Sequence, residues 1–313
     1  MKLVILGNGF DLHHGYKTSF SDFRNHLLNS KDENDKKLIS DVDIILKSKN
    51  VNFEEGILWN DFERIIGQIM KSESNIKIEE IELLSLVEDF TERFYIYLKK
   101  EMINKQIVKN KKISNEIEGA ASILTFNYTN SYNSYLKDSS TDIFHIHGNL
   151  SEDNLPIIGY YYNITYDSNH TDYLLRYHNR AFHKPALAYK QNETNLDIKI
   201  IDYKKKWSNQ ISEIVFIGYS FGESDSHIYN ILNKILMYQS QYENILSSDF
   251  EKMPIIKFKF FNYNTDETKK LIKKVKENIF SKTKRRNFVF ITGNGHIKRQ
   301  KKEIIKFEIT NYN

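Results

Sequence analysis

The hydrophobic pattern predicts a series of short buried strands separated by polar loops. The first is Leu3–Leu6, four apolar residues without polar alternation, which is typical of a strand covered on both faces of a parallel sheet. Similar apolar or β-branched runs recur along the chain. We expect strands at residues 3–6, 121–128, 143–148, 214–220, 255–263 and 288–292, with a weaker signal at 156–162.

Between the first two of these strands the pattern changes to the spacing of amphipathic helices. The longest such run extends from Glu79 to Gln106, where apolar side chains recur at three- and four-residue steps. We therefore predict a helical insertion at about residues 35–112. Later helices are expected over 172–189, from a cap at Ser224 or Asp225 to about 237, and over 266–280.

A shorter amphipathic segment begins with Trp59-Asn60-Asp61-Phe62-Glu63. Asp61 and Glu63 lie two positions apart and cannot share one helical face, so we do not interpret them as a carboxylate pair. A capped helix with buried aromatic side chains is the favoured interpretation. We interpret Thr18–Arg24 in the same way, as a helix start that places Phe20 and Phe23 in the core.

The alternation of strands and helices predicts an α/β protein with a Rossmann-like, mostly parallel sheet, helices on both faces and a helical insertion after the first strand. No internal repeat or low-complexity linker divides the sequence, so we expect a single α/β domain over residues 1–313. In a sheet of this kind, ligands bind beyond the carboxyl ends of the strands.

Charge, cysteine content and the length of apolar runs indicate which classes of protein this chain does not resemble. A formal net charge of +4 over 313 residues does not indicate a nucleic-acid-binding protein. The absence of cysteine excludes disulfides and thiolate metal sites, and it fits a reducing cytoplasm. No apolar run approaches the roughly 18 residues that a membrane span requires. We expect a soluble, cytoplasmic protein that binds neither membranes nor, by preference, nucleic acid.

The positive charge is concentrated late in the chain, in residues 269–276 and 282–286. A solvated helix face and the turn that follows it explain this excess at least as well as phosphate contacts do. We therefore predict that Lys273, Lys274 and Lys276 lie on the surface and are dispensable for catalysis.

Glycine and small polar residues gather at four of the expected strand ends, which is more than packing requires. These strand ends are Gly7-Asn8-Gly9, Thr125–Tyr128, His145–Gly148 and Gly218–Ser220. Because the carboxyl ends of parallel strands meet at one edge of the sheet, we expect all four to form one cleft.

The first strand end has features of a nucleotide-binding turn. Glycines directly after a strand let the backbone turn sharply and approach a phosphate or ribose. Asp11 could then accept a hydrogen bond from a ribose hydroxyl, and the Asn8 amide could both donate and accept. Leu12 stands where a third glycine is expected, so the fingerprint is incomplete, and a tight turn without a ligand is the alternative.

His145 and His147 lie two positions apart on an expected strand and so point to one face. Together with Asp11, His13 or His14 they could bind zinc or iron. Either could instead be a general base, or a histidine hydrogen-bonded within the sheet. We favour the last interpretation for His145 and the catalytic one for His147, which precedes a glycine at the strand exit.

Six motifs follow one another along the chain. They are Gly7-Asn8-Gly9-Phe10-Asp11-Leu12 with His14-Gly15, Thr18-Ser19-Phe20, Trp59-Asn60-Asp61-Phe62-Glu63, Phe126-Asn127-Tyr128-Thr129, His145-Ile146-His147-Gly148 and Ile217-Gly218-Tyr219-Ser220-Phe221-Gly222-Glu223-Ser224-Asp225. Together they resemble the AbiH family of bacteriophage abortive-infection proteins, which implies a role in defence against phage. One departure is Tyr16-Lys17, where the family pattern commonly has Leu-Pro.

Thr125–Thr129, His147-Gly148 and Gly218–Ser220 are also similar to segments of the sirtuin-like fold that bacterial defence NAD hydrolases use. Asp22-Phe23-Arg24 is similar to the Asp-Phe-Arg of the sirtuin cofactor loop. Thr129 replaces the sirtuin aspartate and the zinc-ribbon cysteines are missing, so this likeness implies NAD recognition and not protein deacylation.

This second resemblance implies cleavage of the nicotinamide glycosidic bond of NAD, which is the substrate, with no metal expected. Asn127 would place the attacking water and His147 would act as the base. The residues that hold the dinucleotide would be Gly7, Asn8, Gly9, Phe10, Asp11, Thr125, Gly218, Ser220 and Asp225. Homo-oligomerisation, a phage-derived trigger or a regulatory partner would control the activity.

Two other functions stay open at this point. A metal-dependent nuclease or phosphoesterase could use His145, His147 and Asp11 around a metal ion. A non-catalytic nucleotide sensor would instead bind its ligand and signal to a partner.

Overall fold

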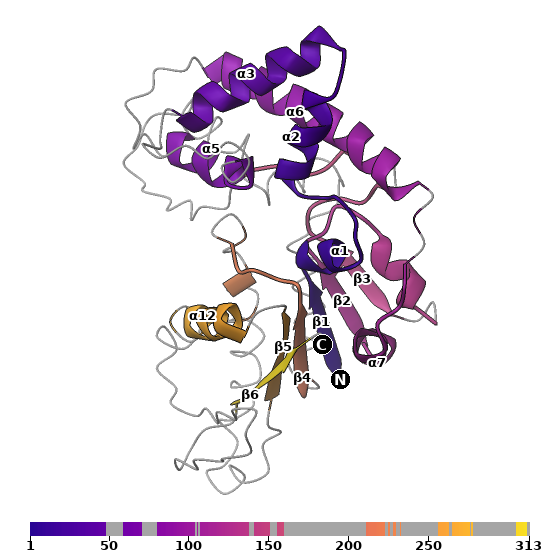
Figure 1. Cartoon of the computed structure of the whole chain (residues 1–313). Coiled ribbons are helices and arrows are strands. Elements are labelled where there is room, and N and C mark those ends of the chain that lie inside the picture. Colours follow the sequence, from indigo (N-terminus) through magenta and orange to yellow (C-terminus); the bar gives the residue numbers. More distant parts are fainter. Residues whose placement is uncertain are drawn as a thin grey trace, which may run out of the picture.

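One parallel β-sheet organises the computed structural model of this chain (Figure 1). The structure describes residues 1–47, 59–70, 80–103, 105, 107–137, 141–150, 155–159, 211–222, 225, 228–229, 232, 256–262, 265–275, 277 and 305–311. The helix expected at 172–189 and the strand expected at 288–292 lie outside the described residues, as does most of the helix expected to end near 237.

The sheet has six strands among the described residues, in the order β3-β2-β1-β4-β5-β6. They are β1 (Lys2–Leu6), β2 (Ser122–Thr125), β3 (Asp142–His145), β4 (Glu213–Ile217), β5 (Ile256–Asn262) and β6 (Ile305–Asn311). Every neighbouring pair is parallel. The order is that of a Rossmann fold, so the predicted α/β class is confirmed.

The strand order reverses between β1 and β4, and the register aligns the strand ends there. Leu6 at the end of β1 pairs with both Thr125 of β2 and Ile217 of β4, and Thr125 pairs with His145 of β3. Four strands therefore end at the same level, and the segments that follow them leave the sheet side by side.

Alternate residues of the strands bury against helices on the two faces of the sheet. On one face, Val4 and Leu6 belong to a core completed by α1 (Gly9–His13), α7 (Lys111–Glu118) and the 3-10 helix η1 (Ser131–Tyr135). On the other face, Leu3 and Ile5 belong to a core completed by α12 (Thr265–Val275). Helices on both faces of the sheet are therefore confirmed.

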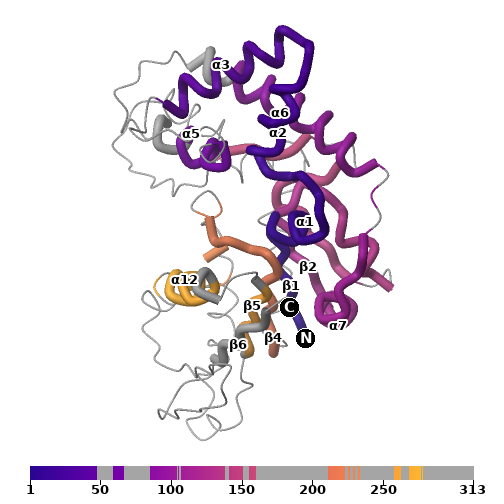
Figure 2. The backbone as a smooth tube through the Cα atoms, in the orientation of Figure 1, coloured from indigo at the N-terminus to yellow at the C-terminus, as the bar shows by residue number. Residues whose placement is uncertain are grey.

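The remaining helices between β1 and β2 form a separate layer beyond the carboxyl ends of the strands (Figure 2). They are α2 (Phe20–Leu28), α3 (Glu33–Lys47), α5 (Phe62–Met70) and α6 (Glu80–Met102). This helical layer has its own aromatic core, in which Phe20, Phe23 and Phe90 pack edge to face. The helical insertion expected after the first strand is therefore present.

The strand β6 was not among the predicted strands, although its sequence carries a signal. Ile305, Phe307 and Ile309 alternate with polar or charged residues, which is typical of an edge strand with one face buried. In the sheet, β6 pairs only with β5, so it is an edge strand among the described ones. No helix in the described part of the chain has both the length and the apolar character of a membrane span.

Glycines allow the turns after β1 and β4 to make direct backbone contact. The Gly9 N–H donates to the Gly218 carbonyl at 2.9 Å, and Gly218 has a φ of +61°. A Cβ at Gly218 would lie 2.2 Å from the backbone nitrogen of Phe10, and one at Gly7 would lie 2.6 Å from the Cα of Tyr219. These glycines therefore allow direct contact between the two turns, a role that the sequence did not suggest.

We expect Gly218→Ala to lower the free energy of unfolding by about 3 kcal/mol or more, because the new Cβ collides with backbone and the positive φ is strained. Gly15→Ala is the matched control, since Gly15 has a φ of +76° but nothing lies within 4 Å of its Cβ position. It should cost only about 1 kcal/mol. Denaturant titrations measure both values, and equal losses would show that the contact between the turns is unimportant.

Candidate functional site

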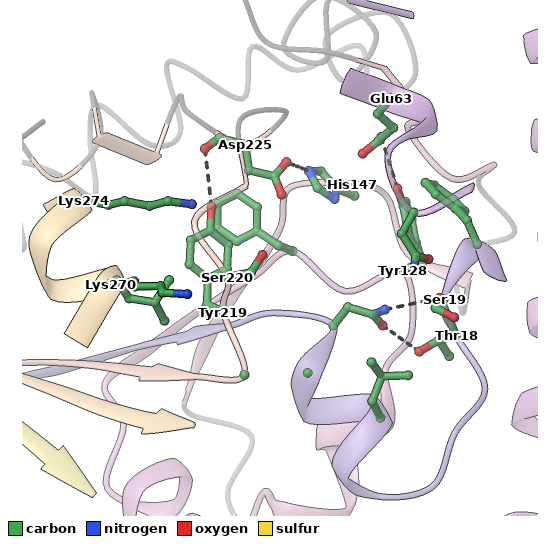
Figure 3. A pocket seen from close by; sticks show the side chains of 18 residues that line it. Thr18, Ser19, Glu63, Tyr128, His147, Tyr219, Ser220, Asp225, Lys270 and Lys274 are labelled. Carbon is green, nitrogen blue, oxygen red and sulfur yellow. Dashed lines mark hydrogen bonds and ion pairs between the residues drawn. The ribbon is translucent and has the colours of Figure 1, made fainter. Parts of the chain in front are cut away.

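A cavity of about 650 Å³ opens where the strand ends face the helical layer (Figure 3). Its volume lies in the range of small-molecule sites. Its lining combines backbone, aromatic and charged groups from both parts of the fold. The lining residues are Asn8, Gly9, Leu12, Thr18, Ser19, Phe20, Asn60, Glu63, Phe126, Tyr128, His147, Gly218, Tyr219, Ser220, Asp225, Lys270, Leu271 and Lys274.

All four predicted strand ends contribute to this cavity. Of the residues expected to bind or react with a ligand, it is lined by Asn8, Gly9, His147, Gly218, Ser220 and Asp225. The others do not line it, namely Gly7, Phe10, Asp11, Thr125 and Asn127. The cavity lies beside the reversal of strand order between β1 and β4, where doubly wound folds bind their ligands.

His147 and Asp225 form a close pair in the cavity wall. The Nε2 of His147 lies 3.1 Å from the Oδ1 of Asp225, and the histidine is 3% exposed. The imidazole lies near the rings of Phe126 and Tyr128, with centroids 5.4 and 5.5 Å away. A carboxylate on one nitrogen fixes the orientation of the ring, which is the arrangement of a general base and its orienting acid.

Glu63 brings a second carboxylate to the cavity, from α5 of the helical layer (Figure 3). It accepts hydrogen bonds from the Gly159 N–H at 3.0 Å and the Tyr128 hydroxyl at 3.4 Å. Burial raises the pKa of Tyr128 well above its ordinary value, and the charge of Glu63 adds to this, so the phenol stays protonated. The sequence interpretation of this motif as a capped helix alone missed the carboxylate.

Lys270 and Lys274 extend to the cavity from α12, one helical turn apart (Figure 3). Lys274 Nζ also donates to the Phe221 carbonyl at 3.4 Å. Lys273 and Lys274 are both exposed, as predicted, and Lys276 lies outside the described residues. Lys274 also lines the cavity, which the interpretation as a solvated face did not include, while Lys273 lies near Glu277. Leu271 and Val275 of this helix are buried, so the same helix serves both core and cavity.

Asn8 and Ser19 are held at the opposite wall by short local contacts. The Asn8 amide accepts from the Thr18 hydroxyl at 2.6 Å and donates to the Thr18 carbonyl at 3.4 Å. Ser19 caps α2 in a capping box with Asp22. The likeness of Asp22-Phe23-Arg24 to a cofactor loop has no counterpart here, because Asp22 caps the helix and Arg24 pairs with Asp43.

Asp11 is fully buried on the α1 side of the sheet and does not line the cavity. It accepts hydrogen bonds from Asn127 Nδ2 at 3.1 Å, from Thr129 Oγ1 at 2.6 Å and from Ser131 Oγ. Burial raises its pKa to about 6 despite these three donors. The expected contact of Asp11 with a ribose is therefore replaced by contacts that tie α1 to the segment after β2.

Asn127 faces Asp11, while its neighbours Phe126 and Tyr128 face the cavity. This follows from the alternation of side chains along an extended segment. The Asn127 amide therefore lies behind the cavity wall, where its Nδ2 donates to Asp11.

The residues proposed for a metal site have separate partners. His145 Nε2 bonds the Tyr132 hydroxyl at 2.7 Å, and His14 bonds the Tyr135 hydroxyl. His147 pairs with Asp225, and Asp11 has the three partners described above. Among the described residues, no group of three histidine or carboxylate side chains is arranged to hold a metal ion.

Comparison with known proteins identifies a family. The sequence model of the family described as bacteriophage abortive infection AbiH matches residues 3–245, which include every residue of the cavity except those of α12. No curated protein matches the chain.

The raised pKa of Asp11 predicts a pH dependence of stability. Between the ordinary value of 3.8 and about 6, the folded protein holds a proton that the unfolded chain loses, so stability falls as the pH rises through this range. The loss is on the order of 3 kcal/mol. Asp11→Asn removes this titration.

Denaturant titrations of wild type and Asp11→Asn at several pH values measure this contribution. The wild-type stability minus that of the variant should decrease from pH 4 to pH 7 and level off above that. A difference that stays constant or rises over this range would contradict a buried carboxyl with a raised pKa.

Proposed function

The chain belongs to the AbiH family of bacteriophage abortive infection proteins, and we propose that it acts in this defence by hydrolysing NAD in the cavity at its strand ends. The close pair of His147 and Asp225 in the cavity wall, with Nε2 and Oδ1 3.1 Å apart, is the observation that carries this proposal.

The position and lining of the cavity suit a dinucleotide. It lies beside the reversal of strand order, next to the turns after β1 and β4, with Asn8, Gly9 and Ser220 in its wall. Aromatic side chains, including Tyr128, line it, and an aromatic ring at such a wall would pack against a flat base. Hydroxyl and amide groups beside them can hydrogen-bond ribose and phosphate oxygens.

The reaction breaks the bond between nicotinamide N1 and ribose C1′. The bonding electrons leave with nicotinamide, and a water oxygen attacks C1′ of the resulting oxocarbenium-like ribose to give ADP-ribose. In a neutral imidazole that donates its Nε2 proton to Asp225, the lone pair lies on Nδ1. His147 would take the water proton there, directly or through a ribose hydroxyl, and Asp225 would stabilise the imidazolium.

This mechanism assigns Asn127 a role that differs from its counterpart in the sirtuin-like pattern. Asn127 holds Asp11 and through it α1, the helix that follows Asn8 and begins at Gly9 in the cavity wall. It therefore acts as a positioning residue. Control of the activity until infection would come from homo-oligomerisation, a phage-derived trigger or a regulatory partner.

We expect His147→Ala to abolish phage protection and to lower the NAD hydrolysis rate of the purified protein by about 100-fold or more. Asp225→Asn should give an intermediate rate, because the imidazole stays but loses its charged partner. NAD consumption is measured with and without chelator, together with cleavage of labelled RNA.

The matched control is His145→Ala, since His145 lies two residues away but contacts Tyr132 and does not line the cavity. It should retain turnover within a fewfold, and thermal melts establish that each variant is folded. Chelator-sensitive RNA cleavage would favour the nuclease. Protection by folded His147→Ala, with NAD left intact by wild type, would favour the non-catalytic sensor.

A further inference from the structure

Side chains of opposite charge line the two ends of the cavity. Lys270 and Lys274 reach one end from α12, which packs beside β5 and β6. Glu63 reaches the other from α5 in the helical layer. His147 and Asp225 lie between these two ends (Figure 3).

The two ends differ in burial as well as in charge. Both lysines are exposed and can adjust their flexible side chains to an anion at the cavity mouth. Glu63 is only 8% exposed, and two hydrogen bonds, from Gly159 and Tyr128, fix its carboxylate. A buried charge is screened less by salt than an exposed one, so the Glu63 end provides a fixed negative potential.

We propose that this charge separation orients an oxidised nicotinamide dinucleotide, with its diphosphate at Lys270 and Lys274 and its cationic nicotinamide ring at Glu63 and Tyr128. The inference rests on the proposed function and adds to it the direction of binding and the oxidation state of the substrate. NAD⁺ carries a positive pyridinium ring and two negative phosphates, so both of its charges meet a complementary end.

The chemistry of each end supports this orientation. Ammonium groups are effective point-charge partners of phosphate oxygens. A pyridinium ring is attracted by a carboxylate and by the face of an aromatic ring, and the Tyr128 ring lies beside Glu63. The glycosidic bond joins the ribose to the cationic ring, so this orientation brings it next to His147 and Asp225.

Binding measurements with two ligands separate the two ends. Carba-NAD⁺ has a methylene in place of the ribose ring oxygen, so it keeps both charges but cannot form the oxocarbenium ion. NADH keeps the phosphates, but its dihydronicotinamide ring is neutral. Calorimetric titrations give the dissociation constants of both ligands for the full chain and for each variant.

Glu63→Gln should weaken carba-NAD⁺ about tenfold and leave NADH within about twofold, because only the charge on the carboxylate is removed. The glutamine carbonyl can still accept from Tyr128 and Gly159. The double variant Lys270→Gln with Lys274→Gln should weaken both ligands by about tenfold in total, about threefold for each exposed lysine.

Lys273→Gln is the matched control, because Lys273 lies on the same helix and does not line the cavity. It should bind both ligands as wild type does. The inference is overturned if folded Glu63→Gln weakens the binding of NADH as much as that of carba-NAD⁺. It is also overturned if the double lysine variant binds both ligands as wild type does, or if wild type binds neither ligand. NAD turnover is assayed separately. Failure of the binding pattern and failure of NAD hydrolysis are therefore distinguishable outcomes.

Discussion

The backbone contact between the turns after β1 and β4 is the constraint on which the rest of this structure depends. The Gly9 N–H bonds the Gly218 carbonyl, and no side chain fits between the two turns. This close contact between the turns fixes the positions of Asn8 after β1 and of Ser220 after β4, both of which line the cavity. Gly218 and Phe221 both have positive φ, at +61° and +53°, so the chain turns twice and presents Tyr219 and Ser220 to the cavity.

A second constraint holds the cavity wall from behind. Asp11 joins α1 to the segment after β2 through three donors, in a position that no solvent reaches. On the other side, Glu63 joins the helical layer to Tyr128 and Gly159. The sheet and the helical layer have separate hydrophobic cores. The hydrogen bonds of Asp11 and Glu63 therefore add polar contacts to the apolar packing on either side of the cavity.

The fold class could be predicted from the sequence because the burial of the central strands requires a recognisable pattern of residues. Leu3–Leu6 and Ile214–Ile217 are apolar without alternation, and central strands of a parallel sheet need that pattern. The sequence also allowed the prediction that His147 and Ser220 lie in one cavity, because the carboxyl ends of parallel strands meet at one edge of the sheet. Lys274 and Glu63 could not be found in this way, because the packing of α12 and α5 against the sheet decides which helix face meets the cavity.

The direction in which the Asn127 side chain points could not be read from its motif. The segment after β2 is extended, so its side chains alternate, and Phe126 and Tyr128 occupy the side that faces the cavity. Asn127 must then face α1, where the buried carboxylate of Asp11 accepts a hydrogen bond from its amide. Moving the amide into the cavity would leave that carboxylate without one of its donors, at a cost of about 1–3 kcal/mol. In the cavity wall itself, His147 lies against Asp225, and Glu63 accepts from the Gly159 N–H and the Tyr128 hydroxyl, so each of these polar groups is positioned by a neighbour in the wall.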